Sequence, residues 1–461
     1  MNRQKDIWQN PATTGALNTL FRVLEDHGIK YCVMNSYEDL PDKVEGDVDI
    51  AVERLGLKNM DQILDSIARE NGLKIIQKIH HNYEKYAYIL SPVKIFKPFR
   101  LQLDFMNDFA VRGYPALISN DFMVKHRRKY KNFFVPDTKS EFIFSILRRI
   151  YKGDLDSSRA KRLKELYLKD SLGCRELLLK YFPPKMSDEI IKIILQGDLH
   201  LFNIQCKFYK RKLLSYSLRR NFPFVLKYWI FEILRAIERI RHPVGIMVAF
   251  LSPDGGGKST IAKNVMQLAA GSFHGEKLFY CRPELFPQPG ELLGFRKPEE
   301  RMQNANPRPH DHKKERPIKS ILRFCYYVVD YILGYYLKVF PLNVKKHLCI
   351  FDRYYYDYLV DLFRYNFSIP NWLPELLLPI IPKPDIVIYL HNTPEELYKR
   401  KKELPLEELK RQVKAYQDIL PKLPNTHQII TDKPIEEVTR EAVSLILEKK
   451  AEQTLSLLKI N

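Results

Sequence analysis

Glycines, a lysine and hydroxyl side chains occur together in one short segment, in a spacing suited to holding phosphate. The segment reads Ser252-Pro-Asp-Gly-Gly-Gly-Lys-Ser259, with an apolar run of strand length before it and a segment of helical character after it. Glycine backbones can turn successive N–H groups toward an anion, and a helix N-terminus adds partial positive charge. Lys258 would reach the outer phosphates of a nucleotide, and the Ser259 hydroxyl would hold Mg²⁺. The residues predicted to bind the nucleotide are Gly255, Gly256, Gly257, Lys258, Ser259 and Thr260.

The usual P-loop pattern has glycine at its first position, where this chain has Ser252. A simpler interpretation is a glycine turn that joins a strand to a helix and leaves its lysine exposed. We favour the phosphate site because strand, loop, Lys-Ser pair and helix follow one another in the required order. The expected cofactors are therefore ATP and Mg²⁺.

Two segments downstream narrow the class of P-loop protein. A buried strand is expected to end at Asp352-Arg353-Tyr354, and a stretch from Lys383-Pro384-Asp385 leads through a second strand to a basic helix that reaches Arg400. Together with Asp254 inside the loop, these motifs make residues 245–447 similar to the thymidylate kinase family of nucleoside monophosphate kinases. The resemblance implies that Asp352 assists the metal or the acceptor and that Arg353 binds the acceptor phosphate. The catalytic residues that it implies are Lys258, Asp254, Asp352, Arg353 and, from the lid, Arg400 and Arg411, with Lys401 a further lid candidate.

The chain departs from that family at the acceptor side. The family's Thr-Arg-Glu-Pro-Gly-Gly motif is replaced by Tyr280-Cys-Arg-Pro-Glu284, and a proline-rich stretch extends to residue 317. We therefore expect a rebuilt acceptor pocket. The alternative role for Arg353 is a structural salt bridge, since ion-pair networks also place arginine beside aspartate.

A second group of chemical residues lies near the N-terminus. Asp47 and Asp49 flank Val48 in an expected strand, so their carboxylates share one face, and a strand from 101 to 105 could place Asp104 beside them. Converging carboxylates can hold two Mg²⁺ ions for phosphoryl or nucleotidyl transfer. Residues 15–137 resemble the nucleotidyltransferase superfamily in this pattern, with Asn35-Ser36 where Gly-Ser is usual. The alternative is an Asp-x-Asp pair on an ordinary surface strand.

The middle of the chain is basic and aromatic. Residues 207–220 carry six Lys or Arg and no acid, and an amphipathic helix is expected over 222–239. An anionic membrane surface, with contact through residues 207–240, and nucleic acid are two candidate partners, of which nucleic acid is less favoured. We favour a third interpretation, in which an aromatic stripe of Phe224, Tyr228, Trp229 and Phe231 packs between domains.

These motifs require strands and helices that alternate at both ends of the chain. The expected fold is α/β, with a parallel P-loop sheet flanked by helices, an N-terminal nucleotidyltransferase-like domain, and a helical connection. The corresponding domains are 1–138, 139–242 and 243–461. The six cysteines form no C-x-x-C pair, no uncharged apolar run reaches membrane-spanning length, and residues 1–11 do not read as a secretory signal, which favours a cytoplasmic protein.

The formal net charge of the 461 residues is +20, which favours anionic partners. The predicted function is ATP- and Mg²⁺-dependent phosphoryl transfer to a nucleoside monophosphate or another small phosphorylated acceptor. One alternative is nucleotidyl transfer to a small molecule or sugar phosphate by the N-terminal domain, as in surface-polysaccharide biosynthesis. Another is a nucleotide-binding adaptor without catalysis. The sequence leaves the acceptor and the oligomeric state open.

Overall fold

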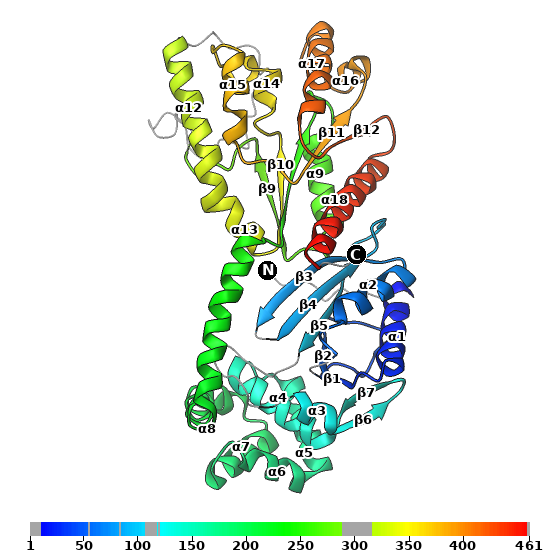
Figure 1. The fold of residues 1–461 in the computed structure, drawn as a ribbon, viewed down its shortest axis with the longest axis vertical. Helices are drawn as coiled ribbons and strands as arrows, with labels where there is room; N and C mark the ends of the chain where they lie inside the picture. The colour runs from blue at the N-terminus through cyan, green and yellow to red at the C-terminus, as the bar shows by residue number, and fades with distance from the viewer. Residues whose placement is uncertain are drawn as a thin grey trace. The chain divides into compact units, whose positions relative to one another are not determined.

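A computed structural model describes residues 11–53, 56–82, 84–106, 118, 120–287 and 316–458 (Figure 1). Most of the proline-rich stretch that was expected to affect the acceptor side lies outside these residues. The chain forms two compact units. The N-terminal unit comprises the described residues of 1–91, 100–239 and 455–461, and the C-terminal unit those of 92–99 and 240–454.

The N-terminal unit is built on a mixed five-stranded sheet with strand order β1-β2-β5-β4-β3. The strands β2 and β5 are parallel, and the other neighbouring pairs are antiparallel. The strands expected around Val48 and over 101–105 are confirmed as β2 and β5, whereas β3 and the β6–β7 hairpin were not predicted. The elements of this part are α1 (Pro11–Asp26), β1 (Tyr31–Val33), β2 (Val48–Val52), α2 (Met60–Glu70), β3 (Lys74–Asn82), β4 (Lys85–Ser91), β5 (Leu101–Met106), α3 (Asn120–Lys125), β6 (Arg127–Tyr130) and β7 (Phe133–Pro136).

The helices that follow pack on this sheet. Cys32, Ala51 and Met106, one from each of three neighbouring strands, belong to the same buried cluster as α4, α5, α6, α7 and the first half of α8. The division into domains at 138 and 242 stays a prediction, but the helices up to residue 239 share a unit with the N-terminal sheet. These helices are α4 (Thr138–Lys152), α5 (Ser157–Lys169), α6 (Ser171–Leu179), α7 (Pro184–Gln196) and α8 (Leu199–Arg241).

Local signals explain where these helices begin and end. The Asp137 side chain accepts a hydrogen bond from the Ser140 backbone N–H at 2.9 Å and caps α4, which ends at Gly153 with φ of 63°. In α8 the residue Asn221 has non-helical angles, so the long helix consists of two helical halves joined at a kink. Among the described residues, none of the helices is long and apolar enough to cross a membrane.

The C-terminal unit contains a parallel five-stranded sheet with order β12-β11-β8-β10-β9, as the strand–helix alternation predicted. α12 covers the face that carries Met247, Ala249 and Leu251, and α9 packs on the opposite face against β8, β9 and β10 (Figure 1). Thr393 caps α16 as expected, because its side chain accepts from the Glu396 N–H at 3.3 Å. The main elements are β8 (Ile246–Leu251), α9 (Lys258–Leu268), β9 (Gly275–Tyr280), α12 (Pro317–Gly334), α13 (Phe340–Val344), β10 (His347–Asp352), α14 (Asp357–Val360), α15 (Trp372–Leu377), β11 (Ile386–His391), α16 (Pro394–Arg400), α17 (Leu406–Ile419), β12 (Thr426–Ile430) and α18 (Ile435–Leu458).

Candidate functional site

The glycine loop leaves the carboxyl end of β8, the central strand of the parallel sheet, which is where ligands bind in open α/β sheets. Gly255 and Gly257 have φ of 84° and 81°, angles that residues with a side chain rarely adopt. A Cβ atom at Gly256 would lie 1.8 Å from the Ser252 Oγ. Each of the three glycines is therefore required by the shape of this loop, and Ser252 fits beneath it because residue 256 has no side chain.

Lys258 turns back into the loop. Its Nζ donates to the carbonyl oxygens of Ser252 and Pro253, each at 2.8 Å, and the side chain is buried. Burial lowers the pKa of Lys258 to about 7, and the nearby positive charge of Arg353 acts in the same direction. A buried lysine held by neutral carbonyls lacks a full counter-charge, which the phosphates of a nucleotide would supply.

Ser259 and Asp352 form a pair at the start of α9. The Ser259 hydroxyl donates to the Asp352 Oδ2, and the buried Asp352 Oδ1 has no hydrogen-bond partner among the described residues. Asp352 reaches this place because β10 lies beside β8, with Asp352 in register with Phe250. A hydroxyl and an orphaned carboxylate oxygen are the hard ligands that Mg²⁺ prefers, so these residues fit the predicted metal.

A buried ion-pair cluster lies beside the loop. The Arg353 Nη2 contacts the Asp254 Oδ1 at 2.6 Å, its Nη1 contacts Asp357, and Arg364 contacts the other oxygen of Asp254. Burial acts to raise the pKa of Asp254, but Arg353 and Arg364 together lower it well below its usual range. Arg353 itself has φ of 71°, an uncommon backbone conformation for an arginine. Asp254 and Arg353, both predicted from the sequence, are thus brought together, and Arg364 joins them without having been predicted.

The predicted lid bases are placed differently. The Arg400 Nη2 donates to the Thr431 carbonyl oxygen at 2.6 Å, and the Arg411 Nη1 donates to the Val360 carbonyl oxygen at 3.0 Å. Both guanidinium groups are therefore engaged in contacts within the unit, and Thr260 is exposed on the first turn of α9. Lys401, the further lid candidate, follows α16 and packs against the glycine loop, since a Cβ atom at Gly255 would be 3.4 Å from the Lys401 Cβ.

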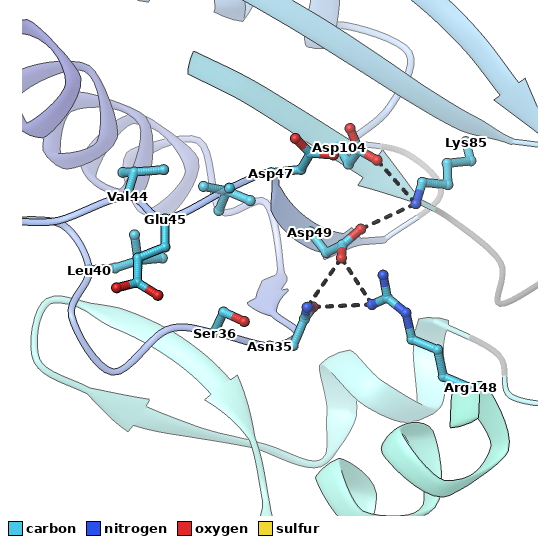
Figure 2. Close-up of a pocket in the computed structure, with 12 residues that line it drawn as sticks. Asn35, Ser36, Leu40, Val44, Glu45, Asp47, Asp49, Lys85, Asp104 and Arg148 are labelled. Atoms are coloured by element: carbon cyan, nitrogen blue, oxygen red, sulfur yellow. Dashed lines mark hydrogen bonds and ion pairs between the residues drawn. The ribbon is translucent and has the colours of Figure 1, made fainter. Parts of the chain in front are cut away.

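The N-terminal unit has a cavity of about 270 Å³ at the predicted carboxylates (Figure 2). Asp49 and Asp104 are in register on the parallel strands β2 and β5. The Lys85 Nζ lies 3.2 Å from an oxygen of each, and the Arg148 Nη1 lies 3.0 Å from the second oxygen of Asp49. The cavity is lined by Asn35, Ser36, Leu40, Val44, Glu45, Gly46, Asp47, Val48, Asp49, Lys85, Asp104 and Arg148.

The charges in this cavity are already paired within the protein. Burial acts to raise the pKa of Asp49, but Lys85 and Arg148 lower it, whereas burial raises the pKa of Asp104. Burial likewise acts against the charge of Lys85, but Asp49 and Asp104 raise its pKa.

Asp47, the third predicted metal ligand, lines the same cavity, and its charge acts to raise the pKa of Asp104. It pairs with the Arg100 Nη2 at 2.5 Å, and across the described ranges no group of three or more His, Cys, Asp or Glu is arranged to hold a metal ion. The ammonium of Lys85 lies between Asp49 and Asp104, so this arrangement does not fit a pair of divalent ions. Lys85 and Arg148 were not predicted, because no local motif marks a base that reaches the site from another strand or helix.

Comparisons with known proteins do not assign this chain to a family. No family model matches the sequence, and none of the curated proteins matches it. Among solved structures, thymidylate kinase from Ehrlichia chaffeensis matches at 20% identity over 44% of this chain and 98% of that chain, with a TM-score of 0.30. The functional assignment therefore rests on the chain's own residues.

Proposed function

We propose that the C-terminal unit is a P-loop kinase that transfers the γ-phosphoryl group of ATP to a small phosphorylated acceptor, with a nucleoside monophosphate as the first candidate. One observation carries the proposal. The Ser259 hydroxyl and an orphaned oxygen of Asp352 lie beside a glycine loop whose lysine is buried and held by backbone carbonyls. This combination of hydroxyl, carboxylate and lysine is what a nucleotide with its metal requires.

The residues divide into those that hold ATP and those that face the acceptor. The loop N–H groups and Lys258 would bind the β- and γ-phosphates, and Ser259 and Asp352 would hold Mg²⁺. When bound, Mg²⁺ neutralises charge on the phosphates. Arg353 and Arg364 are both anchored on Asp254, which fixes two guanidinium groups next to the loop, where they could orient an anionic acceptor.

Replacement of Lys258 tests the kinase assignment. The protein is incubated with Mg-ATP and a panel of nucleoside monophosphates and sugar phosphates, and products are identified by mass. We expect a gain of one phosphate on one acceptor class. Lys258→Ala should lower the rate by at least about 100-fold, because the negative charge of the transferred phosphoryl group would lose the lysine ammonium that stabilises it.

Lys263→Ala is the matched control, because Lys263 is exposed on the same helix. Its rate should equal that of the wild type. An undiminished rate in Lys258→Ala would contradict the assignment. Tight ATP binding without turnover on any acceptor would favour the nucleotide-binding adaptor.

A second candidate function is nucleotidyl transfer in the N-terminal unit. The register of Asp49 and Asp104 in a cavity favours it, whereas the ammonium of Lys85 between them counts against a pair of divalent ions. Under this proposal the product gains a nucleotidyl unit and pyrophosphate is released. Asp49→Asn with Asp104→Asn should then abolish pyrophosphate release, while Lys258→Ala leaves it unchanged. ADP release that is the same in the wild type and in the double variant would contradict nucleotidyl transfer by the N-terminal unit.

A further inference from the structure

The second half of α8 packs on the N-terminal unit through Val225, Tyr228 and Phe231 and, further along, through polar contacts to His80. On the inner side, the Glu238 carboxylate lies 3.2 Å from the His80 Nδ1, and the Arg235 Nη1 donates to the His80 carbonyl oxygen at 3.3 Å. Arg235 also forms an ion pair of 2.6 Å with Glu232. The apolar residues on the other side of this half-helix are therefore additional to those that it buries.

The outward face carries large apolar residues at helical spacing. They are between 42% and 61% exposed, and they recur every three or four positions, so they form one continuous strip along the helix. We call this strip the apolar stripe; its members are Phe222, Leu226, Trp229, Ile233 and Ile237. A contiguous exposed strip of this kind indicates an interaction surface.

The charge around the stripe identifies the partner. α8 carries ten Lys or Arg and two Glu, and the bases on its first half are exposed. We call these exposed bases the basic run; they are Lys207, Arg211, Lys212, Arg219 and Arg220. An apolar strip next to long basic side chains suits the boundary between lipid acyl chains and anionic headgroups.

We propose that the second half of α8 lies on an anionic phospholipid bilayer, with the apolar stripe at the acyl boundary, and that the basic run on the other side of the kink contacts lipid phosphates. A second copy of the chain could cover the stripe but would leave the basic run without an anionic partner. Nucleic acid fits the basic run but leaves five large apolar side chains without a function. The proposal is independent of the kinase assignment.

Flotation of the full-length protein with lipid vesicles tests this surface. We expect binding to phosphatidylcholine vesicles that contain phosphatidylglycerol, weaker binding to phosphatidylcholine alone, and loss of the difference at high salt. Replacing Lys207, Arg211 and Lys212 by Gln should weaken binding about 100-fold, since each base near an anionic surface contributes about fivefold.

Ile233→Glu with Ile237→Glu should weaken binding at least about tenfold, because two carboxylates would enter the acyl boundary. The matched control is Leu168→Glu with Leu172→Glu, since these leucines are 66% and 85% exposed elsewhere in the N-terminal unit. The control should bind as the wild type does. Vesicle binding should also shift tryptophan emission to the blue, and Trp229→Phe should remove that part of the shift.

Three outcomes would overturn the proposal. One is equal binding of wild type and stripe variant to the anionic vesicles. Another is concentration-dependent self-association that the stripe variant abolishes, without any vesicle binding. The third is salt-sensitive binding to duplex DNA in the absence of vesicle binding. Each is measured on the folded full-length chain, so loss of folding cannot be mistaken for loss of the surface.

Discussion

At the scale of single residues, both sites depend on how buried charges are balanced. In the N-terminal cavity, Asp49 and Asp104 have Lys85 between them, so the protein supplies its own cation. In the C-terminal unit, Lys258 is held by two backbone carbonyls and lacks a full counter-charge. The lysine with unmet charge is therefore the stronger indication of an anionic ligand, because burying a charge without compensation is costly.

The lowered pKa of Lys258 predicts that Mg-ATP binding takes up a proton. Without ligand the lysine has a pKa of about 7 and is mostly neutral at pH 8. Phosphate charge favours the protonated form, so binding should raise this pKa and the affinity should fall as pH rises above about 7. Isothermal titration at pH 8 in two buffers of different ionisation enthalpy measures the uptake.

The Lys258→Ala protein serves as the control for that experiment, since it should bind weakly and without the proton uptake assigned to this residue. Lys263→Ala should behave as the wild type does. Identical heats in the two buffers for the wild-type protein would show that Lys258 does not change its protonation on binding.

At the scale of elements, the loop between β8 and α9 has an unusual internal constraint. Ser252 occupies the position where the P-loop pattern has glycine, and its Oγ and Cβ would lie 1.8 and 2.8 Å from a Cβ at residue 256. Rotation of the Ser252 side chain could move the Oγ but not the Cβ. Ser252 and Gly256 are therefore coupled through the space between them.

This coupling predicts a rescue. Gly256→Ala should destabilise the loop by about 1–3 kcal/mol through overpacking and should weaken ATP binding. Ser252→Gly removes both clashing atoms, so the double variant Ser252→Gly with Gly256→Ala should recover most of the loss. Thermal unfolding and ATP affinity of the two single variants and the double variant measure the coupling. Additive effects would show that the contact has no influence on the loop.

The helix α8 shows how far local patterns predict an element. The sequence indicated an amphipathic helix over 222–239, and the structure confirms a helix there. The favoured interpretation, an aromatic stripe packed between domains, stays a prediction. Within the N-terminal unit Tyr228 is buried with Phe224 and Phe231 against it, whereas Trp229 is 52% exposed. The direction of a helix face depends on its neighbours, which sequence periodicity does not identify.

At the scale of the whole molecule, the division into units does not follow the chain in simple order. Residues 92–99, between two strands of the N-terminal sheet, belong to the C-terminal unit, and there the Arg440 guanidinium lies 5.2 Å from the Phe96 ring centre. The helices of 139–239 belong with the N-terminal sheet. Composition along the chain could not reveal this, because it records neighbours in sequence and not in space.

The sequence by itself determined the parts of the protein whose physics is local. These are the glycine loop with Lys258 and Ser259, the parallel alternation of strands and helices from 246 onward, and the strands that carry Asp49 and Asp104. Backbone conformation and hydrophobic period are set by residues close together in the chain, so they can be recognised there.

Only the tertiary structure decided which distant groups meet. It placed Arg364 on Asp254, Lys85 between the two N-terminal carboxylates, and Arg400 and Arg411 on backbone carbonyls. It also buried Val225 and Tyr228 of α8 and left Trp229 and Ile233 exposed. Ion pairs and exposed faces depend on contacts between segments far apart in sequence, and those contacts exist only once the chain has folded.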